Sequence, residues 1–283
     1  MKRDIKSAIT AEFIQLLNEH GAEWVKPFSE LSGSPVNAVT RRKYRGLNSF
    51  ILGFSGSTYW ATYRQWNSVD AQVRRGEKAR YISVPMPIKD RDSGEVKGIL
   101  FKGASVFSAA QVDGWTAPVV ATVDKTAVLR DVDKYVTNTG ADIRDNAHGG
   151  AYYRRSDDFI NMPLRQQFAA TESSSATETY YGTLLHELTH WTGHPARMHR
   201  EMPTNDHMLG FEELTAEIGA TMLCVALGVS PCTRLDHAQY VASWLMALDN
   251  NTDYVASAAT QAQRAMDYLD TLQLVGPPTR QER

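Results

Sequence analysis

The stretch HELTHWTGH, residues 186–194, decides how the second half of this chain is interpreted. His186 and His190 are four residues apart. On a helix their side chains lie about 40° apart around the axis and one turn apart along it, close enough to bind one cation. Glu187 follows the first histidine and can act as a general base toward a water at the metal. The pattern predicts a Zn2+ site, with another divalent ion such as Mn2+ as the alternative.

Residues on either side of this motif predict the helix that the geometry requires. Ser175 and Glu178 form a capping-box pattern at its start, and Gly193 and Pro195 mark its end. The alternative interpretation is a buried helix that contains two structural histidines. A buried Glu187 without a nearby cation would be costly, however, and this favours metal binding.

A second helix, predicted at about 210–227 and beginning GFEELTAEIGATMLC, is expected to supply the third ligand. Ala196 stands where an extended metzincin motif would place a third histidine, so that subclass is excluded. Glu213 and Glu217 are four residues apart on this otherwise apolar helix. Zinc peptidases with a glutamate ligand commonly use a carboxylate four residues later to hydrogen-bond a ligand histidine. We therefore expect Glu213 to bind the metal and Glu217 to support a histidine, with the reverse assignment left open.

Four further side chains are candidates for contact with a substrate or an oxyanion. His194 and His199 lie at or beyond the predicted end of the first helix, and Tyr152 and Tyr153 belong to a strand predicted at 151–154. Their distance from the motif along the chain leaves their direction open at this stage.

The first half of the chain carries the positive charge. Residues 1–125 contain 18 Lys and Arg against 12 Asp and Glu, whereas residues 126–283 contain 12 against 20. Basic side chains interleaved with aromatic rings suit a single strand of DNA, because cations hold the phosphates while unpaired bases stack on the rings. The candidate DNA-binding residues are Arg41, Arg42, Lys43, Tyr44, Arg45, Trp60, Arg64, Trp66, Arg74, Arg75, Lys78 and Arg80.

Two of these residues, Trp60 and Trp66, have an alternative interpretation as core residues, and a run of charges is often only a solvated face. A duplex hides the faces of its bases inside the stack. The aromatic residues therefore favour a single strand over duplex DNA as the ligand.

The predicted fold class is α+β, in two domains. Residues 1–125 are expected to form a small mixed α/β DNA-binding domain, with a first helix that ends at Gly21 and a hairpin turn at Asp92, Ser93 and Gly94. Residues 126–283 are expected to form a mainly helical domain with a small sheet. Its other predicted elements are helices at about 126–140, 236–248 and 253–272 and strands at 151–154 and 159–162.

The remaining features predict a cytoplasmic protein. Cys224 and Cys232 lie in an apolar stretch without a framework of half-cystines, which is typical of reduced core cysteines. The apolar residues near the start have amphipathic helical spacing rather than the continuous core of a signal peptide. No run of 18 apolar residues occurs, so we expect no membrane partner.

On these residues the chain resembles the ArdC family of plasmid antirestriction proteins, over nearly its whole length. The similar stretches in the second half are AYYRRSDDFINMP (151–163), HELTHWTGH followed by Arg197, and EELTAEIGA (212–220). Those in the first half are PVNAVTRRKYRGLN (35–48), YWATYRQW (59–66) and VRRGEKARYISVP (73–85). The resemblance implies a single-stranded-DNA-binding domain joined to a zincin-like metallopeptidase domain.

The expected function is therefore that of a plasmid antirestriction protein, which binds single-stranded DNA and cleaves an unidentified protein, such as a component of the host restriction system. The alternative is a non-catalytic protein that coats single-stranded DNA and holds a structural metal. A DNA mimic is disfavoured, because residues 126–283 have an excess of only eight acidic residues and no long acidic run.

Overall fold

The computed structural model describes residues 5–21, 24–90, 93–118, 125–171, 174–231, 241, 244–248, 251 and 253–273. Its helices are α1 (Ile5–His20), α2 (Leu47–Gly53), α3 (Tyr63–Asn67), α4 (Lys125–Asn138), α5 (Ala176–Thr192), α6 (Asp206–Leu227) and α8 (Tyr254–Leu272), with short 3-10 helices η2 (Lys26–Glu30), η3 (Ala109–Gln111) and η4 (Arg165–Gln167). Its strands are β1 (Val36–Asn37), β2 (Tyr59–Ala61), β3 (Gln72–Val73), β4 (Arg80–Lys89), β5 (Val96–Ser108), β6 (Val112–Asp113), β7 (Asp142–Asn146), β8 (Tyr152–Arg154) and β9 (Phe159–Pro163).

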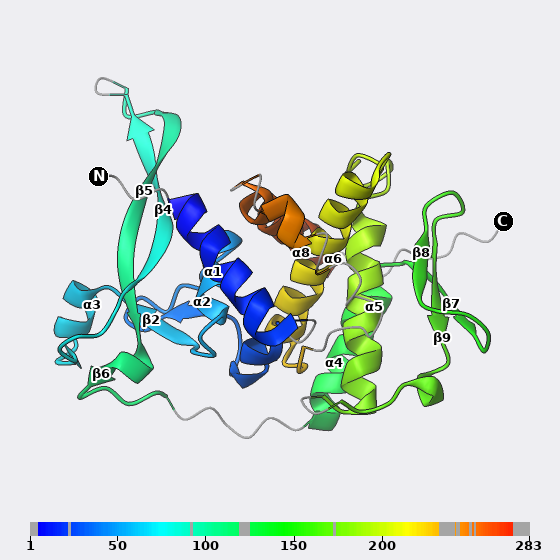
Figure 1. The fold of residues 1–283 in the computed structure, drawn as a ribbon, viewed down its shortest axis with the longest axis horizontal. Coiled ribbons are helices and arrows are strands. Elements are labelled where there is room, and N and C mark those ends of the chain that lie inside the picture. The colour runs from blue at the N-terminus through cyan, green and yellow to red at the C-terminus, as the bar shows by residue number, and fades with distance from the viewer. Residues whose placement is uncertain are drawn as a thin grey trace.

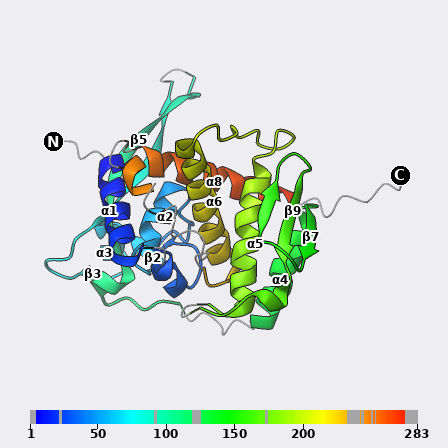
Figure 2. The same ribbon diagram turned by 45° about the vertical axis from the view of Figure 1, so that its right-hand side comes forward.

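A group of helices lies between two sheets (Figure 1). The sheet of order β1-β2-β5-β4 and the small β3-β6 pair belong to the first half of the chain, and the sheet of order β7-β9-β8 belongs to the second. Helix α5 packs against this second sheet and also against α6 and α8, so it lies between the sheet and these two helices, as the turned view in Figure 2 also shows. The combination of separate sheets and helices confirms the predicted α+β class.

Strands β4 and β5 form a long antiparallel hairpin, in which Arg80 pairs with Val106 at the base and Lys89 pairs with Val96 near the tip. The predicted turn lies between them, and its Gly94 has a φ of +73°, in the left-handed region that glycine adopts without strain. Asp92, which was predicted to share this turn, lies outside the described residues.

The base of the hairpin is buried on both faces of the sheet. On one face a cluster is formed by Leu52, Trp60, Ile82 and Val106. On the other face a second cluster contains Ala38, Ala61, Trp66, Ala71, Val73 and Val112. The first half of the chain thus uses its own sheet as the middle layer of a small core.

A larger core joins the two halves of the chain. Phe13 of α1 and Phe50 of α2 lie in the same cluster as Leu214 of α6 and Val255 of α8, and all four side chains are buried. Helix α1 ends at His20 and Gly21 has a φ of +55°, as predicted for the residue after the helix. The division near residue 125 stays a prediction, and residues 119–124 beside it lie outside the described ones.

Helix α5 begins as predicted. The hydroxyl of Ser175 accepts a hydrogen bond from the backbone of Glu178, and the Glu178 side chain accepts one from the backbone of Ser175, which completes a capping box. Helix α6 begins four residues earlier than expected, at Asp206, because the side chain of Asn205 accepts a hydrogen bond from the backbone nitrogen of Met208 at 2.9 Å.

Strand β7 was not anticipated from the sequence. It reads DIRDN, and its side chains are mostly exposed, so it lacks the alternation of apolar and polar residues that indicates a strand. Parallel pairing with β9 holds it in place.

Part of one predicted helix lies outside the described residues. Of the helix expected at 236–248, residues 241 and 244–248 are described and helical, and Cys232 just before it is not described. Among the helices in the described ranges, none is both long enough and apolar enough to cross a membrane.

Candidate metal centre and basic surface

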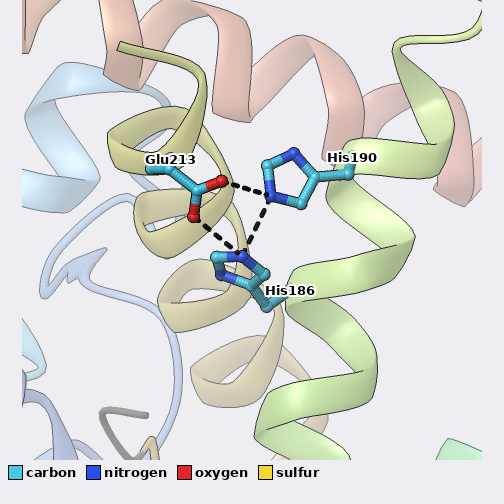
Figure 3. A group of neighbouring side chains, drawn as sticks. All are labelled: His186, His190 and Glu213. Carbon is cyan, nitrogen blue, oxygen red and sulfur yellow. Dashed lines mark hydrogen bonds and ion pairs between the residues drawn. The ribbon is translucent and has the colours of Figure 1, made fainter. Parts of the chain in front are cut away.

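Three side chains from two neighbouring helices converge between α5 and α6 (Figure 3). The Nε2 atoms of His186 and His190 are 3.0 Å apart. Oε2 of Glu213 lies 3.6 Å from Nε2 of His186, and Oε1 of Glu213 lies 3.5 Å from Nε2 of His190. Two nitrogens and one carboxylate group therefore face a common point.

This triangle has the dimensions of a metal site. Ligand atoms held about 2.05 Å from a tetrahedral zinc ion lie about 3.3 Å from one another. The distances above, from 3.0 to 3.6 Å, bracket that value. Two imidazoles and one carboxylate are also the donor set of many catalytic zinc sites, and the same set accepts Mn2+. The residues present thus fit a divalent ion.

The helix geometry explains why these three meet. His186 and His190 project from successive turns of α5, as their spacing predicts. Glu213 reaches them because α6 passes very close to α5 at Gly219, where a Cβ atom would lie only 2.6 Å from Cγ2 of Thr189. The absence of a side chain at position 219 is therefore what allows the carboxylate to approach the histidines.

Each histidine has a second carboxylate behind it. Nδ1 of His186 lies 2.9 Å from Oε1 of Glu217, and Nδ1 of His190 lies 3.0 Å from Oε1 of Glu212. A carboxylate only accepts hydrogen bonds, so a neutral imidazole in this position carries its proton on Nδ1 and presents the lone pair of Nε2 to the triangle. This is the tautomer that a metal ligand needs.

Glu212 and Arg200 were missed by the sequence analysis. The guanidinium of Arg200 donates to both carboxylate oxygens of Glu212, and it also donates to the hydroxyl of Thr192 at 2.6 Å. The sequence signal for Glu212 was its position next to Glu213 in an apolar helix. Arg200 lies in a loop after α5 and carries no signal of its own, because its partner Glu212 lies twelve residues later on another element.

The electrostatics of the cluster favour a positive charge between the carboxylates. Burial opposes the charged forms of His186 and His190, but hydrogen bonds to the glutamates outweigh it, raising the pKa of His186 and taking the pKa of His190 to about 10. Burial likewise opposes ionisation of Glu212 and Glu213. Contacts with the histidines and, for Glu212, with Arg200 nevertheless lower the pKa of Glu212 to about 2 and depress that of Glu213. The glutamates stay ionised and attract a cation.

The remaining residues predicted near the site lie in several places. Glu187 is buried on α5, next to His186. His199, with a φ of +52°, lines a cavity of about 640 Å³ together with Arg200 and Glu212. His194 is half-buried, and its Nδ1 accepts a hydrogen bond from the backbone nitrogen of Ala196 at 3.1 Å.

Tyr152 and Tyr153 lie on β8, an edge strand of the second sheet that contacts α5. The hydroxyl of Tyr153 donates to Asp158 at 2.8 Å and accepts from Arg197 at 3.2 Å. Arg197 in turn pairs with Asp158 and lies over the ring of Trp191. The polar group of Tyr153 is thus engaged in holding β8 against the end of α5, whereas Tyr152 is exposed.

The predicted role of two tryptophans in DNA binding is wrong. Trp60 is 1% exposed and Trp66 is 0% exposed, and each lies in one of the two clusters that cover the first sheet. A ring that is fully enclosed by protein has no face on which a base can stack. Tyr44 is also partly buried, against the cluster that contains Trp60, and burial raises the pKa of its hydroxyl.

The basic candidates divide into two groups. Arg45 pairs with Asp267 of α8, Arg74 pairs with Glu77 and Asp113, and Arg80 pairs with Glu12 of α1. The others are exposed cations for which a phosphate would compete with water, namely Arg41, Arg42, Lys43, Arg64, Arg75 and Lys78. The segment 41–43 is therefore the densest exposed positive region among the predicted residues.

Comparisons with known proteins agree with this architecture. Residues 3–124 match the N-terminal domain of anti-restriction factor ArdC, and residues 130–261 match a zincin-like metallopeptidase family. Protein y4eC of Sinorhizobium fredii (strain NBRC 101917 / NGR234) is 32% identical, over 95% of this chain and 92% of its own length. DNA primase TraC of Escherichia coli is 32% identical over 95% of this chain, which spans only 27% of TraC.

Two crystal structures are similar throughout. The metal-free antirestriction ArdC protein from the R388 plasmid has a TM-score of 0.76 and 34% identity, covering 97% of this chain and 100% of that one. Its Mn(II)-bound structure has the same TM-score and identity, covering 95% and 98%. Because an ArdC protein at this identity is matched along its entire length, the chain belongs to the ArdC family of antirestriction proteins.

Proposed function

We propose that this protein protects incoming plasmid DNA from host restriction by binding single-stranded DNA through residues 1–125 and by cleaving a host protein at a zinc site in residues 126–283. The observation that carries the proposal is the triangle of His186, His190 and Glu213, in which each histidine is backed by a carboxylate. Membership of the ArdC family supports the link to restriction.

In this proposal His186, His190 and Glu213 hold the metal, while Glu217 and Glu212 orient the two imidazoles through Nδ1. When bound, the ion supplies Lewis acidity that polarises a peptide carbonyl and lowers the pKa of an attacking water. Glu187, adjacent to His186, takes the proton from that water and passes it to the leaving amine. Zn2+ is the ion we propose, with Mn2+ as the alternative.

The number of protein ligands supports catalysis rather than a structural role. Among the described residues, the group that could hold an ion consists of His186, His190 and Glu213. Structural zinc sites are commonly closed by four protein ligands, whereas catalytic sites keep one position open for water or substrate. A site with three ligands next to a buried glutamate therefore fits a hydrolase.

Glu187→Gln tests the proposed chemistry. It removes a base but no ligand, so the variant should keep one divalent ion per chain, measured by elemental analysis, and lose hydrolysis of an unfolded protein substrate. Protection of an incoming plasmid in a restricting host should fall with it. Glu201→Gln, an exposed substitution in the loop after α5, is the matched control and should behave as the wild type. Full protection by Glu187→Gln would favour the non-catalytic, DNA-coating alternative.

The exposed cations at 41–43 test the proposed DNA binding. Replacing Arg41, Arg42 and Lys43 together by Ala should weaken binding to single strands of any sequence and reduce the dependence of affinity on salt, because fewer counterions are released. Arg74→Ala is the control, since Arg74 is already paired with Glu77 and Asp113. Equal affinity for single strands and duplex of the same length would contradict the proposed preference.

A further inference from the structure

The outer half of the β4–β5 hairpin projects away from the rest of the protein (Figures 1 and 2). Strand β2 pairs with β5 only at Phe107 and Ser108. Beyond this base the hairpin is a two-stranded ribbon, which we call the hairpin arm and define as residues 85–89 and 96–102. It lies outside both hydrophobic clusters of the first sheet.

The hairpin arm carries apolar side chains that nothing in the described chain covers. Phe101 is 64% exposed. The other large hydrophobic side chains exposed on the arm are Met86, Ile88, Val96 and Leu100. An exposed group of this kind on a projecting ribbon is unfavourable in water and marks a contact surface.

Both faces of the ribbon are apolar. Met86 pairs with Leu100 on one face, and Pro85 pairs with Phe101 on the other, because directly opposed residues in an antiparallel pair share a face. A surface that packs against one flat partner needs only one apolar face. A ribbon with apolar side chains on both faces suits flexible ligand segments that wrap around it or insert beside it.

Positive charge borders the arm. Lys102 is exposed and pairs across the strands with Val84, which packs in the same cluster as Tyr44. Lys89, which pairs with Val96 near the tip of the arm, is exposed as well. A polyanion held by these two cations would run along the length of the arm.

An exposed ring is the other requirement for binding unpaired bases. Trp60 and Trp66 are buried. In the described part of residues 24–118, two of the exposed large hydrophobic side chains are aromatic, Tyr63 and Phe101. Phe101 is the more exposed of the two and lies on the arm. Aliphatic neighbours such as Leu100 can contact the faces of splayed bases.

We propose that the hairpin arm is the base-contacting part of the single-stranded-DNA surface, with Phe101 stacking on an unpaired base while the strand, wrapped around the ribbon, places phosphates at Lys89 and Lys102. This inference rests on the proposed DNA-binding function. It places the contacts with DNA bases on residues outside the segment 41–80, where the sequence analysis placed the candidate DNA-binding residues. A protein that added a strand to β4 is a poorer occupant, because Pro85 and Pro87 lack the backbone N–H groups that such a strand needs.

The test uses the full-length protein and a fluorescein-labelled (dT)20 oligonucleotide, with anisotropy recorded over a salt series. Phe101→Ser and Phe101→Leu should each weaken binding about tenfold with an unchanged salt slope, because a ring is lost and no phosphate contact is. Phe101→Trp should bind as the wild type, and its added fluorescence should be quenched by the oligonucleotide. Met202→Ser, at another exposed apolar residue far along the chain, should bind normally.

The possible results separate the inference from the proposed function. If the wild type binds (dT)20 and Phe101→Ser binds equally well, the inference is overturned while DNA binding stands. If the wild type does not bind (dT)20, both fail. If Phe101→Leu binds normally and only Phe101→Ser is impaired, with loss of a dimer in sedimentation velocity, the arm is an interface between copies and the inference is overturned. Normal melting of all variants shows that each is folded.

Discussion

The guanidinium of Arg200 donates two hydrogen bonds to the carboxylate of Glu212, from Nη2 to Oε1 at 2.7 Å and from Nε to Oε2 at 3.1 Å. The same Oε1 atom lies 3.0 Å from Nδ1 of His190. Arg200 is buried and also donates to the backbone of Thr189 on α5. A candidate metal ligand is thus oriented by a carboxylate that is itself held in place by a cation from the following loop, and the arrangement joins α5 to α6.

Glu212→Gln should weaken metal binding without removing a ligand. The amide can still accept a hydrogen bond from His190, but it lacks the negative charge that makes the imidazole a better donor to the metal and that pairs with Arg200. We expect affinity to fall about 10- to 100-fold. Competition with a chromophoric chelator would measure it, with Glu201→Gln as the control. Unchanged affinity would show that Glu212 does not support the site.

Gly219→Ala should push α5 and α6 apart. The added Cβ would lie 2.6 Å from Cγ2 and 2.8 Å from Oγ1 of Thr189. Overpacking of this kind costs about 1–3 kcal/mol, more than the roughly 1 kcal/mol that Ala gains over Gly in a helix. Thermal melting and chelator competition should both show a loss. Adding Thr189→Ala removes the clashing atoms and should restore metal affinity, and failure of this rescue would contradict the close-approach argument.

Removal of the metal should destabilise the protein. An ion that binds only the folded state contributes about 2.7 kcal/mol when its free concentration is about 100 times the dissociation constant. Dialysis against EDTA should therefore lower the melting temperature, and Zn2+ or Mn2+ should restore it in a concentration-dependent way. His190→Ala, which lacks a ligand, should melt at the same temperature with and without EDTA. A wild-type protein that contains no stoichiometric metal and is insensitive to EDTA would contradict the site.

Asp158 should contribute a pH-dependent part of the stability. Burial opposes its ionisation, but hydrogen bonds from Arg197 and Tyr153 hold its pKa below the usual range. Because the pKa is lower in the folded than in the unfolded state, the ionised carboxylate stabilises the fold above about pH 4, and this contribution is lost as the pH falls through the acid range. Melting in EDTA should depend less on pH in Asp158→Asn than in the wild type. Equal dependence in both proteins would contradict the prediction.

The sequence by itself determined the local geometry. The spacing of His186 and His190 follows from the period of a helix, and the capping box at Ser175 and the left-handed Gly21 depend only on nearby backbone. These features involve residues within a few positions of one another, so they can be read from the order of residues alone.

Only the tertiary structure decided which residues face one another across elements. Glu212 and Arg200 meet because a loop folds back over α6, and Trp66 is buried because α3 covers a sheet whose strands are distant in the chain. Hydrophobicity alone does not distinguish a ring that is covered, such as Trp66, from one that is exposed, such as Phe101. Burial depends on which surfaces are packed together, and that is a property of long-range contacts rather than of the residue or its neighbours in sequence.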